Sequence, residues 1–546
     1  MIAFISMLNH VWNKVLYKLD ILLWRHKLAP TRRTAVPTSA TRVLFCDLMT
    51  MLASTKVEAL IAATMRLDGF MPIVLLERKN SVYEAIFKAA IPDVKFLYFQ
   101  DYLSRYPENY ARDEADKILA MAAGEIDRLI NLEQDGVRIG RNVLSMVVRG
   151  LRIGKIDIQN SNHREKIAIG ISMSLRSIKA AKSIIAEIKP DHAIFNERGY
   201  TPAGEVFDAC LAAGVDTIQW FGAPRSDSLM YKRYDLANRA EHPIAISDDT
   251  WKVLLSSPLS EPRITSVTQK IESNYQVDAF YNRQQLQFGK SIIDANSVRS
   301  ILRLNPAKKT AVIFAHILYD ATFFYGSSIF PDYETWLIES VRLAISNPNL
   351  NWVIKVHPVN IWRSRVDRAQ MEQLEINCLT KEFGTLPDYV CVMPATTNIN
   401  TFSLFSVIDY GLTVRGTIGM ELPCFGIPVI TAGSGRYSGR GFTIDPKTKS
   451  EYAEMLTNLH HVQPLPISVM RLAQLHYDAA IFLRPIPMKS FIQEYQPKGT
   501  IFSRLGSNVK VISKPDASLR ESSDLGRVVD WISSKQGYEL FYEPIV

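Results

Sequence analysis

The stretch SVIDYGLTVRGTIGMELPCFGIPVITAG, from Ser406 to Gly433, decides the fold class of this chain of 546 residues. It begins and ends with short apolar runs rich in strand-forming residues, which predict two buried strands. Between them RGTIGMELPCFG predicts a helix that Pro423 keeps short or kinked. Strand, helix and strand at this spacing are typical of a parallel sheet with helices on its faces.

The same alternation occurs in two blocks of the chain. Around the quoted stretch, KKTAVIFAHILYD, NWVIKVHPVN and DYVCVMP predict three further strands. An earlier block begins with RVLFCDL, MPIVLLER and VKFLYF and resumes with His192 to Asn196 and DTIQWF. Thr55 and Glu58 have the spacing of a capping box for the first helix. The sequence therefore predicts two successive α/β sheets with a ligand cleft between them.

A chain of this length exceeds what one hydrophobic core normally serves, so we expect two domains. Residues 106–188 have a helical pattern, and the last 60 residues are predicted to be irregular. The predicted segments are an amphipathic helix at 1–28, a linker at 29–42, an acceptor domain at 43–285, a bridge at 286–305, a nucleotide-sugar donor domain at 306–480 and a segment at 481–546 that packs back across both domains.

Charge and cysteine usage narrow the partners and the compartment. The net charge of +8 favours anionic partners, and because the basic residues are dispersed over the chain, nucleic acid is the weakest of these. The five cysteines are far apart and have no CxxC spacing, which is typical of the reduced thiols of a cytoplasmic protein. No uninterrupted apolar run reaches the length of about 18 residues that a membrane-spanning helix needs.

The first 28 residues mix large apolar side chains with Lys14, Lys18, Arg25 and Lys27. An amphipathic helix on the anionic inner face of the cytoplasmic membrane has this composition. A helix that docks on the body of the protein itself explains the pattern equally well.

Polar residues follow predicted strands at three further places, where open α/β sheets bind ligands. Glu197 follows a strand and is our first candidate for a catalytic base, although pairing with Arg198 would also explain it. His316 and Asp320 are further catalytic candidates, and a structural role is the common alternative for such a histidine. His357 and Pro358 end another strand, so His357 either contacts a phosphate or caps its own loop.

The quoted stretch holds the fourth cluster. Arg415, Gly416 and Thr417 occupy a strand-to-helix turn, where unpaired N–H groups can bind phosphate. Glu421 lies one helical turn further and either accepts hydrogen bonds from a ribose or pairs with a cation. Arg436 and Arg440, in the glycine-rich loop AGSGRYSGRGF that follows, are candidate phosphate or acceptor contacts. We expect this loop to be flexible enough to close over a donor.

VIKVHP together with DYGLTVRGTIGMELPCFGIPVITAGSGRYSGRGFTIDP resembles the C-terminal half of the bacterial capsule polysaccharide synthesis family, which includes Kdo transferases of GT-B fold. The resemblance covers about residues 310 to 460, and NERGYTPAGE resembles the N-terminal counterpart more weakly. It implies a GT-B-like fold with two Rossmann-like domains facing a central cleft. It also implies that His357 and Thr417 hold donor phosphate, with Glu421 near the ribose. Where relatives have a paired serine turn, this chain has Arg415-Gly416-Thr417.

These observations lead to one functional hypothesis and two alternatives. We expect a metal-independent glycosyltransferase, without a cofactor, that moves a sugar from a nucleotide-activated donor, with a CMP-sugar such as CMP-Kdo favoured, to a capsule or other surface polysaccharide or its lipid-linked precursor. Other capsule assembly proteins are expected partners. The alternatives are a nucleotide-sugar epimerase of the same fold and a non-catalytic accessory protein of capsule synthesis and export.

Overall fold

The computed structural model describes residues 2–28, 41–49, 51–122, 124–225, 227–277, 279–280, 283–284, 286–287, 289–359, 361, 373–495, 507–512, 518–543 and 545. Of the linker predicted at 29–42, residues 29–40 lie outside this description. None of the helices among the described residues is long and apolar enough to cross a membrane.

The N-terminal half is built on a seven-stranded sheet with the strand order β14-β6-β5-β4-β1-β2-β3. Its parallel strands are β1 (Arg42–Asp47), β2 (Met71–Leu76), β3 (Lys95–Tyr98), β4 (His192–Phe195) and β5 (Asp216–Gly222). The antiparallel pairs join β6 (Ser228–Tyr234) to β5 and β14 (Ile486–Pro487) to β6. The sequence analysis missed β6 because Lys232 and Arg233 interrupt its apolar pattern. Both are buried, and Glu539 and Asp216 neutralise them.

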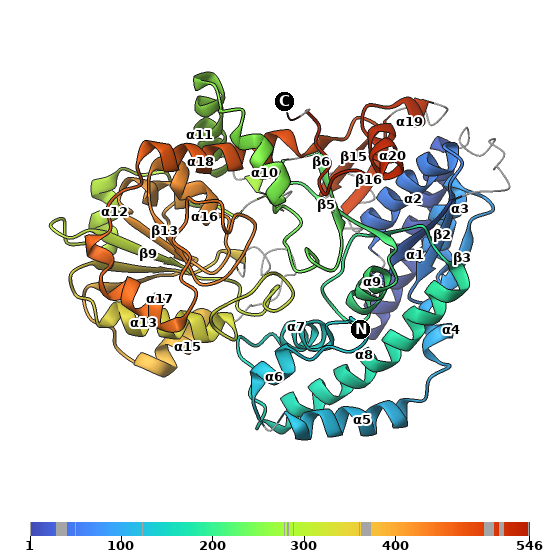
Figure 1. Cartoon of the computed structure of the whole chain (residues 1–546), viewed down its shortest axis with the longest axis horizontal. Coiled ribbons are helices and arrows are strands. Elements are labelled where there is room, and N and C mark those ends of the chain that lie inside the picture. Colours follow the sequence, from blue (N-terminus) through green and yellow to red (C-terminus); the bar gives the residue numbers. More distant parts are fainter. Residues whose placement is uncertain are drawn as a thin grey trace.

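Helices cover both faces of this sheet (Figure 1). The helices of this half are α2 (Leu52–Leu67), α3 (Ser81–Ala90), α4 (Phe99–Leu103), α5 (Glu108–Met121), α6 (Ile126–Ile130), α7 (Ile139–Leu151), α8 (Ser161–Ile188) and α9 (Ala203–Ala212), of which α5 packs on α8 and α6 on α7. The helical pattern predicted for 106–188 is confirmed, but the predicted capping box is wrong. Helix α2 begins at Leu52, and Thr55 instead donates its hydroxyl hydrogen to the Asp47 carboxylate, at 2.5 Å.

The C-terminal half has an all-parallel sheet with the strand order β11-β10-β9-β12-β13. All five predicted strands are present: β9 (Thr310–Phe314), β10 (Asn351–Lys355), β11 (Val390–Met393), β12 (Tyr410–Thr413) and β13 (Val429–Thr431). The helices packed on it include α13 (Tyr333–Ile345), α15 (Leu374–Phe383), α16 (Ile418–Glu421), α17 (Lys449–Thr457) and α18 (Ile467–Asp478).

The parallel strands of the two sheets share one order along the chain. In each sheet the first strand lies beside the second on one side and the fourth on the other, which creates a crevice at the carboxyl ends of β1 and β4 and of β9 and β12. Contacts between the halves come from these edges, for example between Tyr200 after β4 and Asp320 after β9. The chain therefore has the GT-B-like fold that the sequence predicted, with two Rossmann-like halves facing one another (Figure 1).

The chain passes between the halves more than once. Helices α10 (Asp248–Leu255), α11 (Glu261–Gln276) and α12 (Ala295–Leu302) lead into the C-terminal half. After α18 the chain returns, because β14 joins the N-terminal sheet. The described residues after β14 include regular elements where the sequence analysis predicted an irregular end: the hairpin of β15 (Phe491–Tyr495) and β16 (Ser507–Val511), α19 (Ser518–Glu521) and α20 (Leu525–Ser534). These elements lie against α2 (Figure 1).

Helix α1 (Ile2–Lys27) docks on the N-terminal half and still exposes apolar side chains. Trp24 is buried and donates its Nε1–H to the Ile86 carbonyl, while Asp20 pairs with Lys56 at 2.7 Å. On the outward side the apolar residues Trp12, Val15, Leu19, Leu22 and Leu23 are between 40% and 59% exposed. The docking that the sequence left open therefore accounts for one face of α1 only.

Candidate functional site

The crevice between β9 and β12 is organised around His316. Its Nε2 lies 3.1 Å from the Val414 amide, which donates to it, and 3.0 Å from the Thr413 hydroxyl. The Gly416 amide in turn donates to Thr413 Oγ1 at 3.0 Å, and the imidazole stacks on Tyr333. Because Nε2 accepts a hydrogen bond, we assign the ring proton to Nδ1. His316 thus fixes the turn that carries Arg415.

Arg415 is almost fully buried, with 6% of its surface exposed. Its Nη2 donates to the Ser327 carbonyl at 3.3 Å, whereas Nε and Nη1 have no hydrogen-bond partner among the described residues. Burying a charged group without partners costs several kcal/mol unless an opposite charge compensates it. The guanidinium therefore presents two unused donors at the crevice.

Further cationic side chains gather around Arg415 from both halves. Arg436 donates to the Arg415 carbonyl at 3.1 Å and to His242 Nε2 at 2.8 Å, and its Nε has no partner among the described residues. Arg141 of α7 is held by the Phe323 and Gly326 carbonyls, and burial together with Arg138 and Arg415 lowers its pKa. This concentration of positive charge suits an anionic ligand.

The two histidines of this cluster are neutral near neutral pH. Burial, and then the charges of Arg415, His357 and Arg436, hold the pKa of His316 well below its ordinary value. Burial and the neighbouring arginines, with Arg436 first among them, do the same to the pKa of His242. Positive charge at the crevice therefore comes from the arginines.

Glycines in α16 and in the loop after β13 permit close packing between these two segments. A Cβ on Gly435 would lie 2.8 Å from Arg415 Cβ, and one on Gly419 would lie 2.0 Å from the Tyr437 hydroxyl oxygen. Tyr437 is buried and donates to the Gly416 carbonyl at 2.8 Å. The loop is packed against the β12–α16 turn in this structure, and its closure over a donor stays a prediction.

Two other predictions for the glycine-rich stretch change as well. Helix α16, which follows Gly416 and Thr417, has only four residues before the chain tightens into a 3₁₀ turn at Pro423. Such a short helix has a small dipole, so the arginines contribute more to anion binding than the helix terminus does. Arg440 donates to the carboxylate of Asp248 and to the Ile246 carbonyl. Its guanidinium holds the loop to the N-terminal half, and we leave it out of the candidate anion site.

The neighbouring strand β10 adds a second group of titratable side chains. His357 Nδ1 accepts the Val359 amide hydrogen at 3.1 Å, so the histidine caps its own loop, and Pro358 beside it is buried. Burial and Lys290 lower the pKa of Lys355, at the end of β10, to about 7 although Glu421 opposes them. Glu421 accepts the Tyr275 phenol hydrogen at 2.6 Å, and burial raises the pKa of its carboxyl to about 7.

The predicted catalytic acids come from opposite halves and approach the same two side chains. Asp320 accepts the Tyr200 hydroxyl at 3.4 Å and lies 4.0 Å from the Arg149 guanidinium. Glu197 accepts the amide hydrogens of Arg198 and Gly199, and its charge raises the pKa of Tyr200 together with burial and Asp320. The expected Glu197–Arg198 contact is thus to the backbone of Arg198, whose guanidinium bonds to Gln219 and two carbonyls.

The sequence analysis missed Arg141, Arg149, His242, Tyr275 and Lys355. A charged residue at the end of a buried strand was a usable signal for Lys355 in VIKVHP. The others lie on helices and loops of the N-terminal half or the bridge. Only the folded chain brings them to the crevice.

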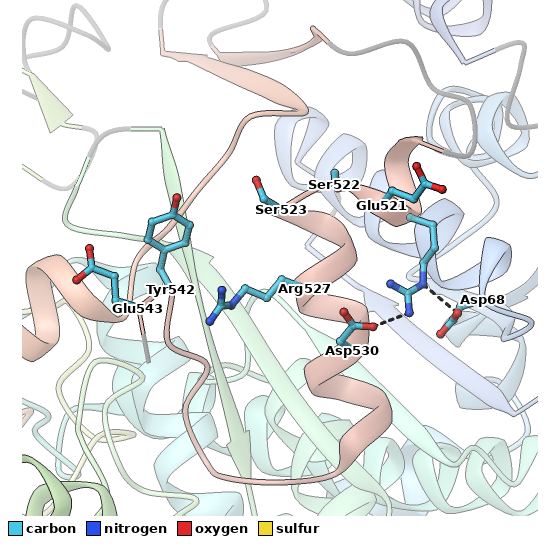
Figure 2. A pocket seen from close by; sticks show the side chains of 9 residues that line it. Asp68, Glu521, Ser522, Ser523, Arg527, Asp530, Tyr542 and Glu543 are labelled. Carbon is cyan, nitrogen blue, oxygen red and sulfur yellow. Dashed lines mark hydrogen bonds and ion pairs between the residues drawn. The ribbon is translucent and has the colours of Figure 1, made fainter. Parts of the chain in front are cut away.

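A large open hollow, of about 860 Å³, lies elsewhere, against α20 (Figure 2). Arg520 there donates to Asp68 and Asp530. Both carboxylates are labelled in Figure 2, where dashed lines end on them. Its lining holds four acids, two arginines, two serines and Tyr542. None of these charged side chains is buried without partners as that of Arg415 is. Among the described residues, no cluster of three or more His, Cys, Asp or Glu could hold a metal ion.

Comparison with known proteins found distant likenesses in structure. No family sequence profile matches the chain, and no curated protein sequence matches it. The structure is similar to KpsC, β-Kdo 2,4-transferase, from Thermosulfurimonas dismutans, with 16% identity over 58% of this chain and 86% of the other and a TM-score of 0.33. It is also similar to a UDP-GlcNAc 2-epimerase from Neisseria meningitidis, with 11% identity over 81% and 97% of the two chains and a TM-score of 0.27. Anabaena HepE in complex with UDP-glucose has 12% identity over 81% and 95% and a TM-score of 0.28. Likenesses this distant carry no argument about activity.

Proposed function

We propose that the chain is a glycosyltransferase that uses a nucleotide-activated sugar. The observation that carries the proposal is the buried Arg415 guanidinium, with two unpaired nitrogens at the crevice between β9 and β12. Ligands bind at such crevices in open α/β sheets, and a phosphate group would supply the missing acceptors. Arg436 Nε also has no hydrogen-bond partner among the described residues, which favours the same kind of ligand.

In this proposal the arginines stabilise the departing nucleotide phosphate. As the bond from the sugar to the phosphate breaks, negative charge grows on the phosphate oxygens, and fixed cations lower the barrier by countering it. Neutral His316 acts as a positioning residue, because it holds the Val414–Arg415 turn. The backbone of Gly416 and Thr417, together with His357 and Pro358, would border the phosphates, and Glu421 would face the ribose.

An acidic side chain between the two halves would activate the acceptor hydroxyl. We propose Glu197 as the general base that takes the proton of the acceptor hydroxyl, with Asp320 as the alternative. Asp320 contacts Tyr200 and Arg149, and the charge of Glu197 acts on the same two groups. The oxygen of that hydroxyl then bonds to the sugar carbon that the phosphate leaves. The donor would be a CMP-sugar such as CMP-Kdo and the acceptor a capsule or related surface polysaccharide, which rests on the sequence resemblance.

Calorimetry with CMP, CDP, UDP and GDP tests the donor site. We expect one cytidine nucleotide to bind in the micromolar range, about −8 kcal/mol, in the presence of EDTA. An accessory protein would bind none of the four, and that result would end the proposal. If a bound nucleotide-sugar is converted to its epimer without an acceptor, the chain is an epimerase.

We further propose that α1 attaches the protein to an anionic membrane surface. Trp12, Val15, Leu19, Leu22 and Leu23 recur at helical spacing on its exposed side, and Lys18, Arg25 and Lys27 are exposed on the same helix. Apolar side chains beside cations suit a surface of acidic headgroups. The double variant Leu19→Ser/Leu22→Ser should lose cosedimentation with vesicles that contain phosphatidylglycerol.

This variant keeps Trp24 and the docked face of α1, so the fold should not change. Ile467→Ser, at a residue that is 70% exposed on α18, is the matched control and should still sediment with the vesicles. Equal sedimentation of the double variant and the control would contradict the attachment.

A further inference from the structure

The hairpin of β15 and β16 shares one apolar core with helix α1. Phe491, Val509 and Val511 of the hairpin belong to the same core cluster as Ile21 and Trp24 of α1, and this cluster also contains much of α2. Strand β16 contacts both α1 and α2. The two elements therefore form one outer layer over α2, and the sides that they turn away from this core are neighbouring parts of the protein surface.

The outward side of the hairpin has the same composition as the outward side of α1. Ile492 and Ile512 are 40% and 55% exposed. Lys510, which pairs with Ile492 across the two strands, is exposed, and so is Lys489 just before β15. A single exposed isoleucine is ordinary on a protein surface. Two isoleucines among lysines, next to a helix with the same mixture, extend one apolar and cationic surface.

The charge of α1 on this surface is purely positive. The helix contains a single acid, Asp20, which is buried against Lys56. The exposed cations Lys18, Arg25 and Lys27 have no acidic partner among the described residues. Apolar side chains among uncompensated cations suit a surface of acidic lipid headgroups.

Helix α10 shows that exposed apolar side chains alone do not make such a surface. Val253 and Leu255 are 44% and 46% exposed there. In the first turn of the same helix, however, the side chains of Asp248 and Asp249 are 82% and 87% exposed. Acidic headgroups repel these carboxylates. The layer of α1 and the hairpin therefore fits an anionic membrane, whereas α10 does not.

We propose that the hairpin of β15 and β16 is a second membrane contact, so that the layer of α1 and the hairpin faces the headgroups of an anionic bilayer. This inference rests on the proposed attachment through α1. The isoleucines enter the interface, and the lysines extend to the phosphates. A single helix can roll about its axis on a membrane, whereas two elements fix the orientation of the N-terminal half. Glu521 and Asp530, which are exposed at the hollow against α20, stay outside this contact.

Sedimentation with vesicles that contain phosphatidylglycerol tests the hairpin separately from α1. Ile492→Thr/Ile512→Thr keeps the β-branched side chains that strands favour and removes apolar surface. The partition of this variant onto the vesicles should fall about tenfold, because each isoleucine loses the apolar area that it buries in the interface. Val253→Thr/Leu255→Thr is the matched control, since its two residues are similarly exposed. Its partition should equal that of the wild type.

Lysine acetylation followed by mass spectrometry measures the contact in the wild type, without any substitution in the hairpin. With the same vesicles, Lys510 and Lys489 should react about threefold more slowly than without them, because headgroups shield their ammonium groups. Lys18 and Lys27 of α1 should be protected as well. Lys252 of α10, whose side chain is 75% exposed, should react at the same rate in both samples.

The inference is overturned if the hairpin variant partitions like the wild type, or if vesicles leave the acetylation rate of Lys510 unchanged. If the hairpin variant does not fold, the acetylation of the wild type decides. Unchanged sedimentation of Leu19→Ser/Leu22→Ser defeats the attachment through α1 instead, and a wild type that does not bind vesicles defeats both contacts. Nucleotide calorimetry does not depend on vesicles, so it judges the proposed glycosyltransferase separately.

Discussion

The two halves place opposite charges at equivalent positions of their sheets. The crevice between β1 and β4 is lined by Asp47, Glu58 and Glu197, whereas the crevice between β9 and β12 is bordered by Arg415 and Arg436. The strand order is the same in both sheets, so backbone topology decides where each crevice lies. The side chains after the strands decide which ligand each crevice can accept. The difference predicts an anionic partner at the Arg415 crevice and disfavours one at the crevice between β1 and β4.

We expect the largest effect from a substitution of Arg415. Arg415→Met should lower kcat/KM about 1,000-fold, which corresponds to about 4 kcal/mol of transition-state stabilisation. The free energy of unfolding without ligand should not fall, because the variant removes a buried charge that lacks partners. Steady-state kinetics and urea unfolding measure the two effects. A loss of stability together with activity would mean that Arg415 is a structural residue.

The next largest effect is expected at the acidic side. Glu197→Gln should lower kcat about 100-fold, because a general base contributes about that much or more, and leave nucleotide affinity within about twofold. Single-turnover kinetics and calorimetry measure these quantities. Asp320→Asn, from the facing half, is the paired variant. A larger loss of kcat in that variant would transfer the role of the base to Asp320.

The C-terminal half, which carries the arginines, also contains a buried acid, Glu421. The pH dependence of stability tests whether this acid is protonated in the folded protein. Burial raises the pKa of Glu421 to about 7, above the value of an unfolded chain, so the folded state holds this proton more tightly. The contribution of Glu421 to stability is therefore largest below pH 4.5 and decreases as the pH rises toward 7. Glu421→Gln should flatten this decrease by about 1–3 kcal/mol in urea unfolding at pH 5 and pH 7. An unchanged pH dependence would show that Glu421 is ionised in the folded protein.

The smallest effect is expected at Arg440, which lies in the same glycine-rich loop as Arg436. Its guanidinium is already paired with Asp248, an aspartate whose side chain is 82% exposed. Because surface pairs of this kind contribute about 0–1 kcal/mol, Arg440→Met should change nucleotide affinity by less than about threefold. Calorimetry of Arg440→Met and Arg415→Met with the same nucleotide tests whether the two arginines differ in their contribution to binding. An equal loss in both variants would place Arg440 in the anion site.

The fold was predictable because its determinants are local. Short β-branched runs separated by helical patterns and by residues such as Gly426 specify parallel strands with crossover helices, and all ten predicted strands formed. The sequence analysis did not predict strand β6 because Lys232 and Arg233 lie in it. Their partners Glu539 and Asp216 come close to them only in the folded chain. The end of the chain was misjudged for the same reason, since β14 pairs with a strand more than 250 residues away.

By itself, the sequence determined two α/β halves, the strand ends that carry His316, Arg415 and Glu197, and the amphipathic character of the first helix. Only the tertiary structure decided which of these residues meet. It packed Gly435 against Arg415, brought His242 to Arg436 and Tyr275 to Glu421, and left two nitrogens of Arg415 without a partner among the described residues. The physical reason is that strand and helix patterns repeat within a few residues, whereas burial and the satisfaction of charges depend on neighbours that are distant along the chain.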